Sequence, residues 1–173
     1  MSQEHESFTM IFSEHYPGLC RFLEIMMGRR HLAEEIAQES FLRLYKLGDG
    51  AIRAGEERFW LYRVARNLAL NEIRKRETPQ RLFNQIRDMF RAPDPTPQTE
   101  LEQKERQQIL RTLLHHLPET QRAALLLREQ QEMSYREIAS VLSVSESKVK
   151  VDIFRARNAL RGHWKEVERL SNE

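Results

Sequence analysis

Apolar residues recur along the chain at spacings of three and four residues, the period of an amphipathic helix. This pattern predicts helices over about 8–26, 32–47 and 57–77, with a polar glycine-bearing loop over 48–57. Pro17-Gly18 is expected to break or kink the first helix, because proline removes a helical hydrogen bond. No run alternates with the period of a strand, so the sequence predicts an all-α fold.

Prolines divide the chain into two parts. Three of the six prolines fall within 92–97, and each lacks an amide hydrogen and pushes the residue before it away from the helical region. We therefore predict two small helical domains joined by a flexible Pro-rich linker. The first domain is expected over 1–91, ending in a short amphipathic helix at 78–91, the linker over 92–103 and the second domain over 104–173.

Residues 134–160 have the pattern of a helix-turn-helix. Ser134 and Glu137 are spaced as a capping box, and Ser145 is a suitable N-cap for a second helix. The second helix is expected to bury four side chains: Val149, Ile153, Ala156 and Leu160. The remaining faces are expected to reach solvent or a DNA major groove: Lys148, Lys150, Val151, Asp152, Phe154 and Arg155. An ordinary helical hairpin is the alternative, which basic residues on the second helix disfavour.

Charge is distributed unevenly along the chain, although the formal net charge is only +2. Residues 1–57 carry six Lys and Arg against ten Asp and Glu, whereas 58–91 carry nine against three. Residues 145–165 carry six against two. Two separate basic segments indicate a polyanion that is contacted at two places.

Little in the sequence points to catalysis, a cofactor or a membrane. The single cysteine, Cys20, excludes an internal disulfide and a multi-cysteine zinc site, and it is expected in the core, with a redox-sensing thiol as the alternative. His115 and His116 are adjacent and would point to different helix faces, so metal chelation is disfavoured. No apolar stretch is long enough to span a bilayer and no signal peptide is visible, so a cytoplasmic location is expected.

The second domain resembles the promoter-reading domain of the sigma factor family. The resemblance rests on Leu117-Pro118-Glu119, Gln121-Arg122, 125–128, 133–139, Val149-Lys150 and 154–157. In the first domain, 33–43 resembles the polymerase-binding helix of that family, and 59–69 resembles its promoter-melting helix. Order and spacing agree over nearly the whole chain. The long extra regions of housekeeping sigma factors are missing, so the chain resembles the compact extracytoplasmic-function (ECF) group.

The resemblance implies a non-enzymatic initiation factor, without a cofactor, that binds core RNA polymerase and promoter DNA. It also implies control by an anti-sigma partner, which in this group is often membrane-anchored. One rival hypothesis is a stand-alone helix-turn-helix regulator, which would need a ligand or phosphoacceptor domain in front. The other is a helical nucleic-acid-processing enzyme, which would need clustered carboxylates or metal ligands.

The resemblance implies three sets of site residues. The clamp of the largest polymerase subunit would bind Glu34, Glu35, Gln38 and Glu39. The minus-ten element would contact Trp60, Tyr62, Arg63, Arg66, Asn67, Arg74, Lys75 and Arg76, of which the cations are the stronger candidates and Trp60 is expected in the core. The minus-thirty-five element would contact Ser147, Lys148, Lys150, Val151, Asp152, Phe154 and Arg155.

Two positions depart from the common pattern of the family. Val151-Asp152 stands where a small polar residue and an arginine are usual, and an aspartate can accept a hydrogen bond from the amino group of cytosine. Ser143 occupies the helix-turn-helix turn where glycine is usual, which is expected to affect local strain more than function. The resemblance also implies that the loop over 48–57 captures a base extruded from the melted strand.

Overall fold

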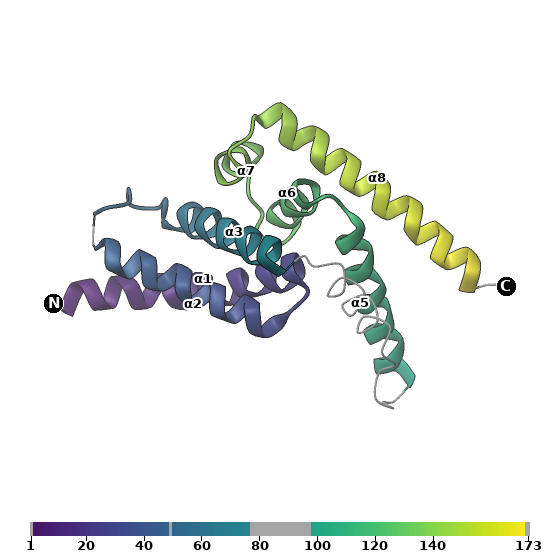
Figure 1. The fold of residues 1–173 in the computed structure, drawn as a ribbon, viewed down its shortest axis with the longest axis horizontal. Coiled ribbons are helices and arrows are strands. Elements are labelled where there is room, and N and C mark those ends of the chain that lie inside the picture. Colours follow the sequence, from purple (N-terminus) through teal and green to yellow (C-terminus); the bar gives the residue numbers. More distant parts are fainter. Residues whose placement is uncertain (1, 49, 77–97, 172–173) are drawn as a thin grey trace.

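All regular structure in the described residues is α-helical. The computed structural model describes residues 2–48, 50–76 and 98–171 (Figure 1). The helices are α1 (Ser2–Met27), α2 (Arg30–Leu47), α3 (Glu57–Arg76), α5 (Gln98–His116), α6 (Glu119–Glu129), α7 (Tyr135–Leu142) and α8 (Glu146–Ser171). The predicted all-α fold is therefore confirmed.

Two sequence-based boundaries differ from the structure. Helix α1 runs without a break through Pro17, because packing on both sides of the proline outweighs its cost of about 3 kcal/mol: Tyr16 stacks on Phe12, and Leu19 is fully buried. Helix α5 begins at Gln98, so 98–103 are helical and do not extend the linker. The expected helix at 78–91 and the Pro-rich segment 92–97 lie outside the described residues.

The first domain is built from α1, α2 and α3, which pack on one another. Its core is formed by apolar side chains at helical spacing: Leu19, Phe22, Leu23 and Met26 from α1, Ala33, Ile36, Ala37 and Phe41 from α2, and Leu61 and Ala65 from α3. Aromatic rings extend this core between α1 and α2, where Phe8 meets Phe41 and Tyr45 edge-on at centroid distances of 6.3 and 5.2 Å.

The second domain is organised by the helix-turn-helix of α7 and α8. The capping box is present as predicted: the Ser134 hydroxyl accepts from the Glu137 amide, and the Glu137 carboxylate accepts from the Ser134 amide. Ser145 caps α8 by accepting from the amide of Lys148 at 3.1 Å. Ser143 ends α7 in the left-handed conformation, with φ of 56°, which is a strained position for a residue with a Cβ.

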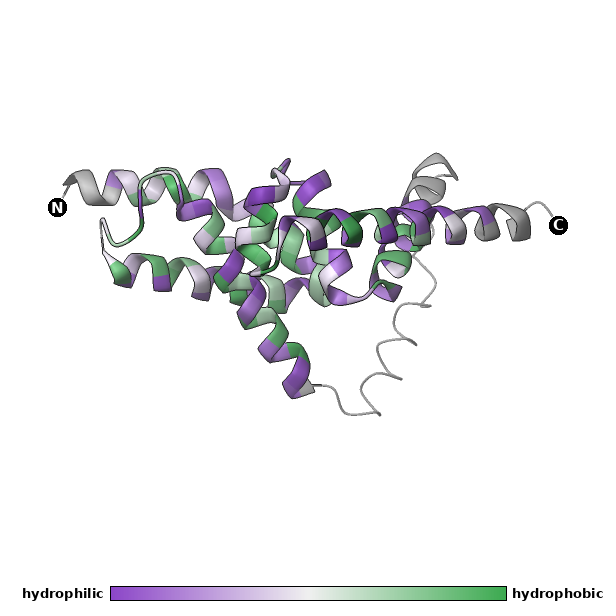
Figure 2. Ribbon diagram, turned by 90° about the horizontal axis from the view of Figure 1, so that it is seen from above, coloured by the Kyte–Doolittle hydropathy of each residue, from purple (hydrophilic) through white to green (hydrophobic). Residues whose placement is uncertain are grey.

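The two domains pack against each other. Helix α3 lies against α7, and α1 lies against α5 and α6. Buried apolar residues form one cluster that continues from α1–α3 into α5–α8. Figure 2 shows the apolar residues gathered toward the centre of the molecule, with polar residues outside. This arrangement determines which of the candidate residues are accessible.

Candidate functional site

The acidic face of α2 is accessible. Glu34, Glu35 and Glu39 each pair with a cation one turn away on the same helix, at distances of 2.9, 3.1 and 2.8 Å from Arg30, His31 and Arg43. Pairs of this exposed kind contribute little to stability, so the carboxylates can exchange these partners for external cations. Gln38 is exposed between them.

Sequence reasoning missed two apolar members of the α2 face. Leu42 and Tyr45 are exposed, and they follow Gln38 at four and seven residues, which places all three on one side of the helix. Exposed apolar side chains beside carboxylates are typical of a protein-binding surface. The helical spacing was the signal that could have found them.

Cys20 of α1 is half-buried against the core. Burial raises the pKa of the Cys20 thiol, and a contact with the Tyr16 hydroxyl only partly offsets that effect. The reactive thiolate is thus disfavoured. This environment agrees with the structural interpretation of Cys20.

A cavity of about 400 Å³ opens where the loop between α2 and α3 meets the start of α1. Its walls include two aromatic rings, Phe8 and Tyr45, with Ile52 from the loop and Glu57 at the start of α3. Gly48 and Gly50 adopt positive φ values of 78° and 77°, which lets the loop turn sharply around the opening. The cavity combines apolar walls with a carboxylate.

The aromatic residues of α3 pack in or against the hydrophobic core. Tyr62 is 1% exposed and meets Phe22 edge-on at 5.3 Å, so the expectation that it stacks on bases is wrong for this arrangement. Burial raises the pKa of its phenol. Trp60 is half-buried and packs against the core, as expected.

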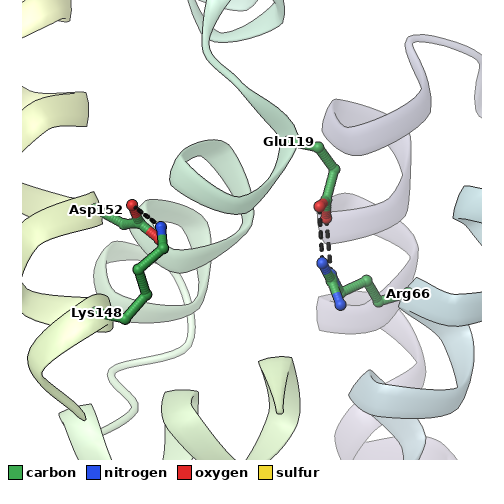
Figure 3. A network of polar contacts seen from close by, with 4 residues as sticks. All are labelled: Arg66, Glu119, Lys148 and Asp152. Atoms are coloured by element: carbon green, nitrogen blue, oxygen red, sulfur yellow. Dashed lines mark hydrogen bonds and ion pairs between the residues drawn. The ribbon is translucent and has the colours of Figure 1, made fainter. Parts of the chain in front are cut away.

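The arginines of α3 contact the second domain. Arg66 is 9% exposed and donates two hydrogen bonds of 2.7 Å to the carboxylate of Glu119, at the start of α6 (Figure 3). Arg63 donates to the Ser140 hydroxyl of α7 at 2.8 Å, and Arg58 donates to the backbone carbonyl of Gln131. Of the minus-ten candidates, Arg66 is therefore buried at the domain junction, and Arg63 is partly covered by it.

The remaining polar candidates of α3 stay accessible. Asn67, Arg74 and Lys75 are exposed. Arg76 is the last residue of α3, and its side chain lies outside the described part of the chain. The far end of the helix thus presents cations to solvent while its middle does not.

On α8, one candidate points inward. Asp152 is 1% exposed and pairs with Lys148, whose Nζ lies 2.5 Å from the carboxylate (Figure 3). The expectation that Asp152 reaches solvent is therefore wrong. It shares the inner side of α8 with Val149, Ile153 and Ala156, and Lys148, one turn earlier, compensates the buried charge.

The outer side of α8 has an apolar centre between cations. Ser147, Val151, Phe154 and Asn158 follow one another at four, three and four residues, and all are exposed, Phe154 by 66% and Val151 by 42%. Lys150 and Arg155 lie on either side of this ridge. Asn158 was missed, although the same spacing predicts it.

The junction between the two domains also holds a histidine. His115 of α5 lies against the turn between α1 and α2, where a Cβ placed on Gly28 would lie 3.0 Å from Nε2 of the imidazole. Nδ1 faces an Nη1 of Arg122 at 2.8 Å. Burial, together with the charge of Arg122, lowers the pKa of His115 to about 4, so the imidazole is neutral at neutral pH.

The part of the chain that the structure describes shows neither a three-ligand metal-binding cluster nor a membrane-spanning helix. It contains no cluster of three or more histidine, cysteine or acidic side chains arranged to hold a metal ion. Among 2–48, 50–76 and 98–171, no helix combines the length and apolar character that crossing a membrane requires.

Known proteins resemble this chain over most of its length. The "ECF RNA polymerase sigma factor SigM" of Bacillus subtilis is 30% identical over 152 residues, covering 87% of this chain and 91% of the relative. The "ECF RNA polymerase sigma factor SigW" of the same organism is 32% identical over 155 residues, covering 82% and 80%. A solved structure, that of sigma factor RpoE in complex with the anti-sigma factor NepR from Bartonella quintana, superposes with a TM-score of 0.71 at 22% identity, covering 92% of this chain and 98% of that one.

Family models divide the chain as the fold does. Residues 11–78 match Sigma-70 region 2, which spans α1–α3, and residues 107–160 match Sigma-70 region 4, which spans the helix-turn-helix. The acidic α2, the basic α3 and the helix-turn-helix thus coincide with the parts of a protein that binds core RNA polymerase and promoter DNA. The chain belongs to the ECF RNA polymerase sigma factors of the sigma-70 family.

Proposed function

We propose that this sigma factor divides its work among three helices: α2 docks on core polymerase, α3 holds the melted minus-ten strand and α8 reads the minus-thirty-five duplex. The observation that supports this division is the coexistence, in one chain, of an exposed acidic helix, a basic helix and a helix-turn-helix with a cationic outer side. The factor acts without a cofactor or catalysis of its own, and it acts in the cytoplasm.

Docking of α2 uses both charge and apolar contact. Glu34, Glu35 and Glu39 offer carboxylates to the basic clamp of the largest polymerase subunit, and Gln38 offers an amide among them. Leu42 and Tyr45 add apolar area on the same side of α2. Charge steers the encounter, whereas burial of Leu42 and Tyr45 contributes to affinity.

Helix α3 and the loop before it hold single-stranded DNA. Arg74, Lys75 and Arg76 follow the phosphate backbone, and Asn67 donates to or accepts from a base or a sugar. Arg63 and Arg66 can reach the backbone only when their contacts with Ser140 and Glu119 are broken. The cavity beside Tyr45 accepts an extruded base, since its aromatic walls can contact the face of a nucleobase and Glu57 can accept from an exocyclic amino group.

Helix α8 reads duplex DNA with an apolar centre. Val151 and Phe154 face the groove floor, where apolar side chains contact the C5-methyl groups of thymine. Ser147 and Asn158 on the same ridge are able to bond base edges, and Lys150 and Arg155 contact phosphate or guanine. Asp152 positions Lys148 and takes no part in reading bases.

Control by an anti-sigma factor completes the proposal. Two solved structures that superpose on this chain are complexes with a partner protein: sigma factor RpoE with the anti-sigma factor NepR, and CnrH, at a TM-score of 0.65, with the cytosolic domain of CnrY. We propose that this chain is likewise held inactive by an anti-sigma partner, and that the partner is anchored in the membrane.

Run-off transcription with bacterial core polymerase tests the proposal. Discrete transcripts are expected only when the chain is added, and they should be lost in the double variant Arg74→Ala/Lys75→Ala. Both side chains are exposed, so the variant should fold normally. Lys104→Ala/Arg106→Ala, which removes two exposed cations of α5, is the matched control and should transcribe normally. DNA binding without transcription or association with polymerase would favour a stand-alone helix-turn-helix regulator.

A further inference from the structure

Two histidines from distant parts of the chain meet where the end of α5 passes the far half of α8. The ring centroids of His116 and His163 lie 6.5 Å apart, and the ring planes are inclined by 31°. Both side chains are exposed. The neighbouring His115 turns instead toward Arg122 and is not part of this pair. The tertiary fold therefore creates the pair, which adjacency in the sequence does not.

The two histidines lie on the sides of α5 and α8 that face each other. Helix α8 continues past the helix-turn-helix as one helix (Figure 1), and His163 follows Ala156 and Leu160 on its inner side at seven and three residues. His116 follows the buried Leu113 at three residues on α5. Because the two helices are in contact, the imidazoles lie together at the solvent edge of that contact.

Each imidazole uses Nδ1 to contact its own helix. Nδ1 of His116 lies 2.7 Å from the carbonyl oxygen of Thr112, and Nδ1 of His163 lies 2.7 Å from that of Ala159. A carbonyl oxygen only accepts, so each Nδ1 carries the proton and Nε2 of the neutral ring carries a lone pair. The described residues form no hydrogen bond with either Nε2. Histidines that bind metals have this arrangement, in which a backbone carbonyl fixes the ring and the other nitrogen is the ligand.

The separation of the rings suits one shared metal ion. Two imidazoles that bind one Zn²⁺ through Nε2, at Zn–N distances of about 2.0–2.1 Å, have ring centroids roughly 5–6.5 Å apart, depending on the N–Zn–N angle. The observed 6.5 Å is at the upper end of this range, and rotation of two exposed side chains can shorten it. Imidazole suits zinc, nickel and copper, whereas magnesium and calcium prefer oxygen ligands.

We propose that His116 and His163 form a two-histidine site for a divalent transition-metal ion of the zinc, nickel or copper class, which ties the far half of α8 to α5. Water completes the coordination of the ion. The site is separate from the residues that the proposed function assigns to polymerase and DNA, and it does not rest on that function. His163 also lies beyond 107–160, the part of the chain that matches Sigma-70 region 4, so the family match does not account for it.

The ion acts next to a weak point of α8. Gly162 directly precedes His163, and a Cβ placed there would meet nothing within 4 Å, so packing does not require glycine at this position. Glycine inside a helix is unfavourable. A metal bridge to α5 gives this part of α8 a second attachment. An ion that binds only the folded chain stabilises it by mass action, so the site links the stability of the second domain to the concentration of free metal.

Titration of the full chain with zinc chloride tests the proposal. Isothermal titration calorimetry compares the natural chain with His116→Gln, with His163→Gln and with the double variant. Both side chains are exposed, so these variants should fold normally. His31→Gln is the matched control, because it removes an exposed histidine of α2 that pairs with Glu35. Thermal denaturation with and without zinc gives a second readout.

The natural chain and His31→Gln are expected to bind one Zn²⁺ at this site with equal affinity. His116→Gln and His163→Gln should each bind it at least about tenfold more weakly, since loss of a ligand costs no less than loss of its hydrogen-bond partner. The double variant should bind no more weakly than either single variant, because one substitution already removes the bridge. Free zinc about tenfold above the Kd should raise the Tm of the natural chain by about 3–6 °C and leave these variants unchanged.

Three results would overturn the two-histidine site. One is equal zinc affinity of the natural chain and the double variant. Another is a pair of single variants that keep the natural affinity at half the stoichiometry, which would mean that the two imidazoles bind zinc independently. The third is zinc binding that survives in the double variant and disappears in Cys20→Ser, which would place the ion at the thiol.

Discussion

Helices α3 and α8 are both basic and are both proposed to bind DNA, yet they differ in how much of their surface is exposed. The middle of α3 is covered by the second domain, with Arg66 only 9% exposed. The outer ridge of α8 is open, with Phe154 exposed by 66%. A charge pattern identifies a surface that suits a polyanion, but it does not indicate whether another part of the same chain already occupies that surface.

The difference matches the two kinds of DNA that the helices are proposed to bind. Duplex DNA exists before melting, and the helix assigned to it is accessible in the folded chain. The strand that α3 is proposed to hold exists only after melting, and the middle of α3, around Arg66, is covered in the chain without DNA.

The prediction with the largest expected effect tests whether Tyr62 of α3 lies in the hydrophobic core or on the surface proposed to bind DNA. Tyr62→Ala removes a fully buried ring beside Phe22 and should lower the free energy of unfolding by about 3–5 kcal/mol, measured by urea denaturation. Tyr62→Phe keeps the ring and is the control. Near-normal stability of Tyr62→Ala would show that the ring is not in the core.

The folded chain should lose stability in acid, because His115 is held neutral where α5 meets the turn between α1 and α2. The pKa of His115 is about 4 in the folded chain, below its ordinary value of 6.5, so folding favours the neutral imidazole. The stabilisation is complete above pH 6.5 and is lost as the pH falls toward 4, where the unfolded chain binds more protons. We expect a loss of about 2–3 kcal/mol across this window.

Urea denaturation at pH 7, 5.5 and 4.5 measures this loss. His115→Gln should show a shallower pH dependence than the natural chain. His163→Gln, at an exposed histidine of α8, should retain the full dependence. Identical pH dependences for the natural chain and His115→Gln would contradict the assignment of this loss to His115, because the carboxylates titrate in both proteins.

The apolar ridge of α8 should read thymine. Phe154→Ala is expected to weaken binding to the minus-thirty-five duplex about tenfold without changing stability, because the ring is exposed. Replacing thymine by uracil in the minus-thirty-five duplex removes only the C5-methyl group. This change should weaken binding by the natural chain and not by Phe154→Ala. Loss of equal size in both proteins would mean that Phe154 does not contact a methyl group.

The smallest expected effect concerns the turn between α7 and α8. Ser143 has a φ of 56°, which glycine adopts without strain. Ser143→Gly should therefore raise the free energy of unfolding by about 0.5–1 kcal/mol, measured by thermal denaturation. Arg136→Gly, at an exposed helical position of α7, should instead lower stability, because glycine is unfavourable within a helix.

Local features were predictable because their causes lie within a few residues. The capping box of Ser134 and Glu137 needs only their spacing, and the buried stripe of α8 follows from helical period. The resemblance to sigma factors likewise depends on short motifs in order. Continuation of α1 through Pro17 was not predictable, since it depends on packing by other helices.

The sequence by itself determined the helices, their caps, the two basic segments and the family, because each depends on neighbouring residues or on a motif. Only the tertiary structure decided which charged side chains are free. Arg66 and Asp152 look like exposed DNA contacts in sequence, yet one meets Glu119 across the domain junction and the other turns inward beside Lys148. The helical period does not specify which group a polar side chain will contact, because that group can lie on a distant segment of the chain. Nor does it specify which face of a helix is buried when that face carries a charge, because packing against other helices decides this.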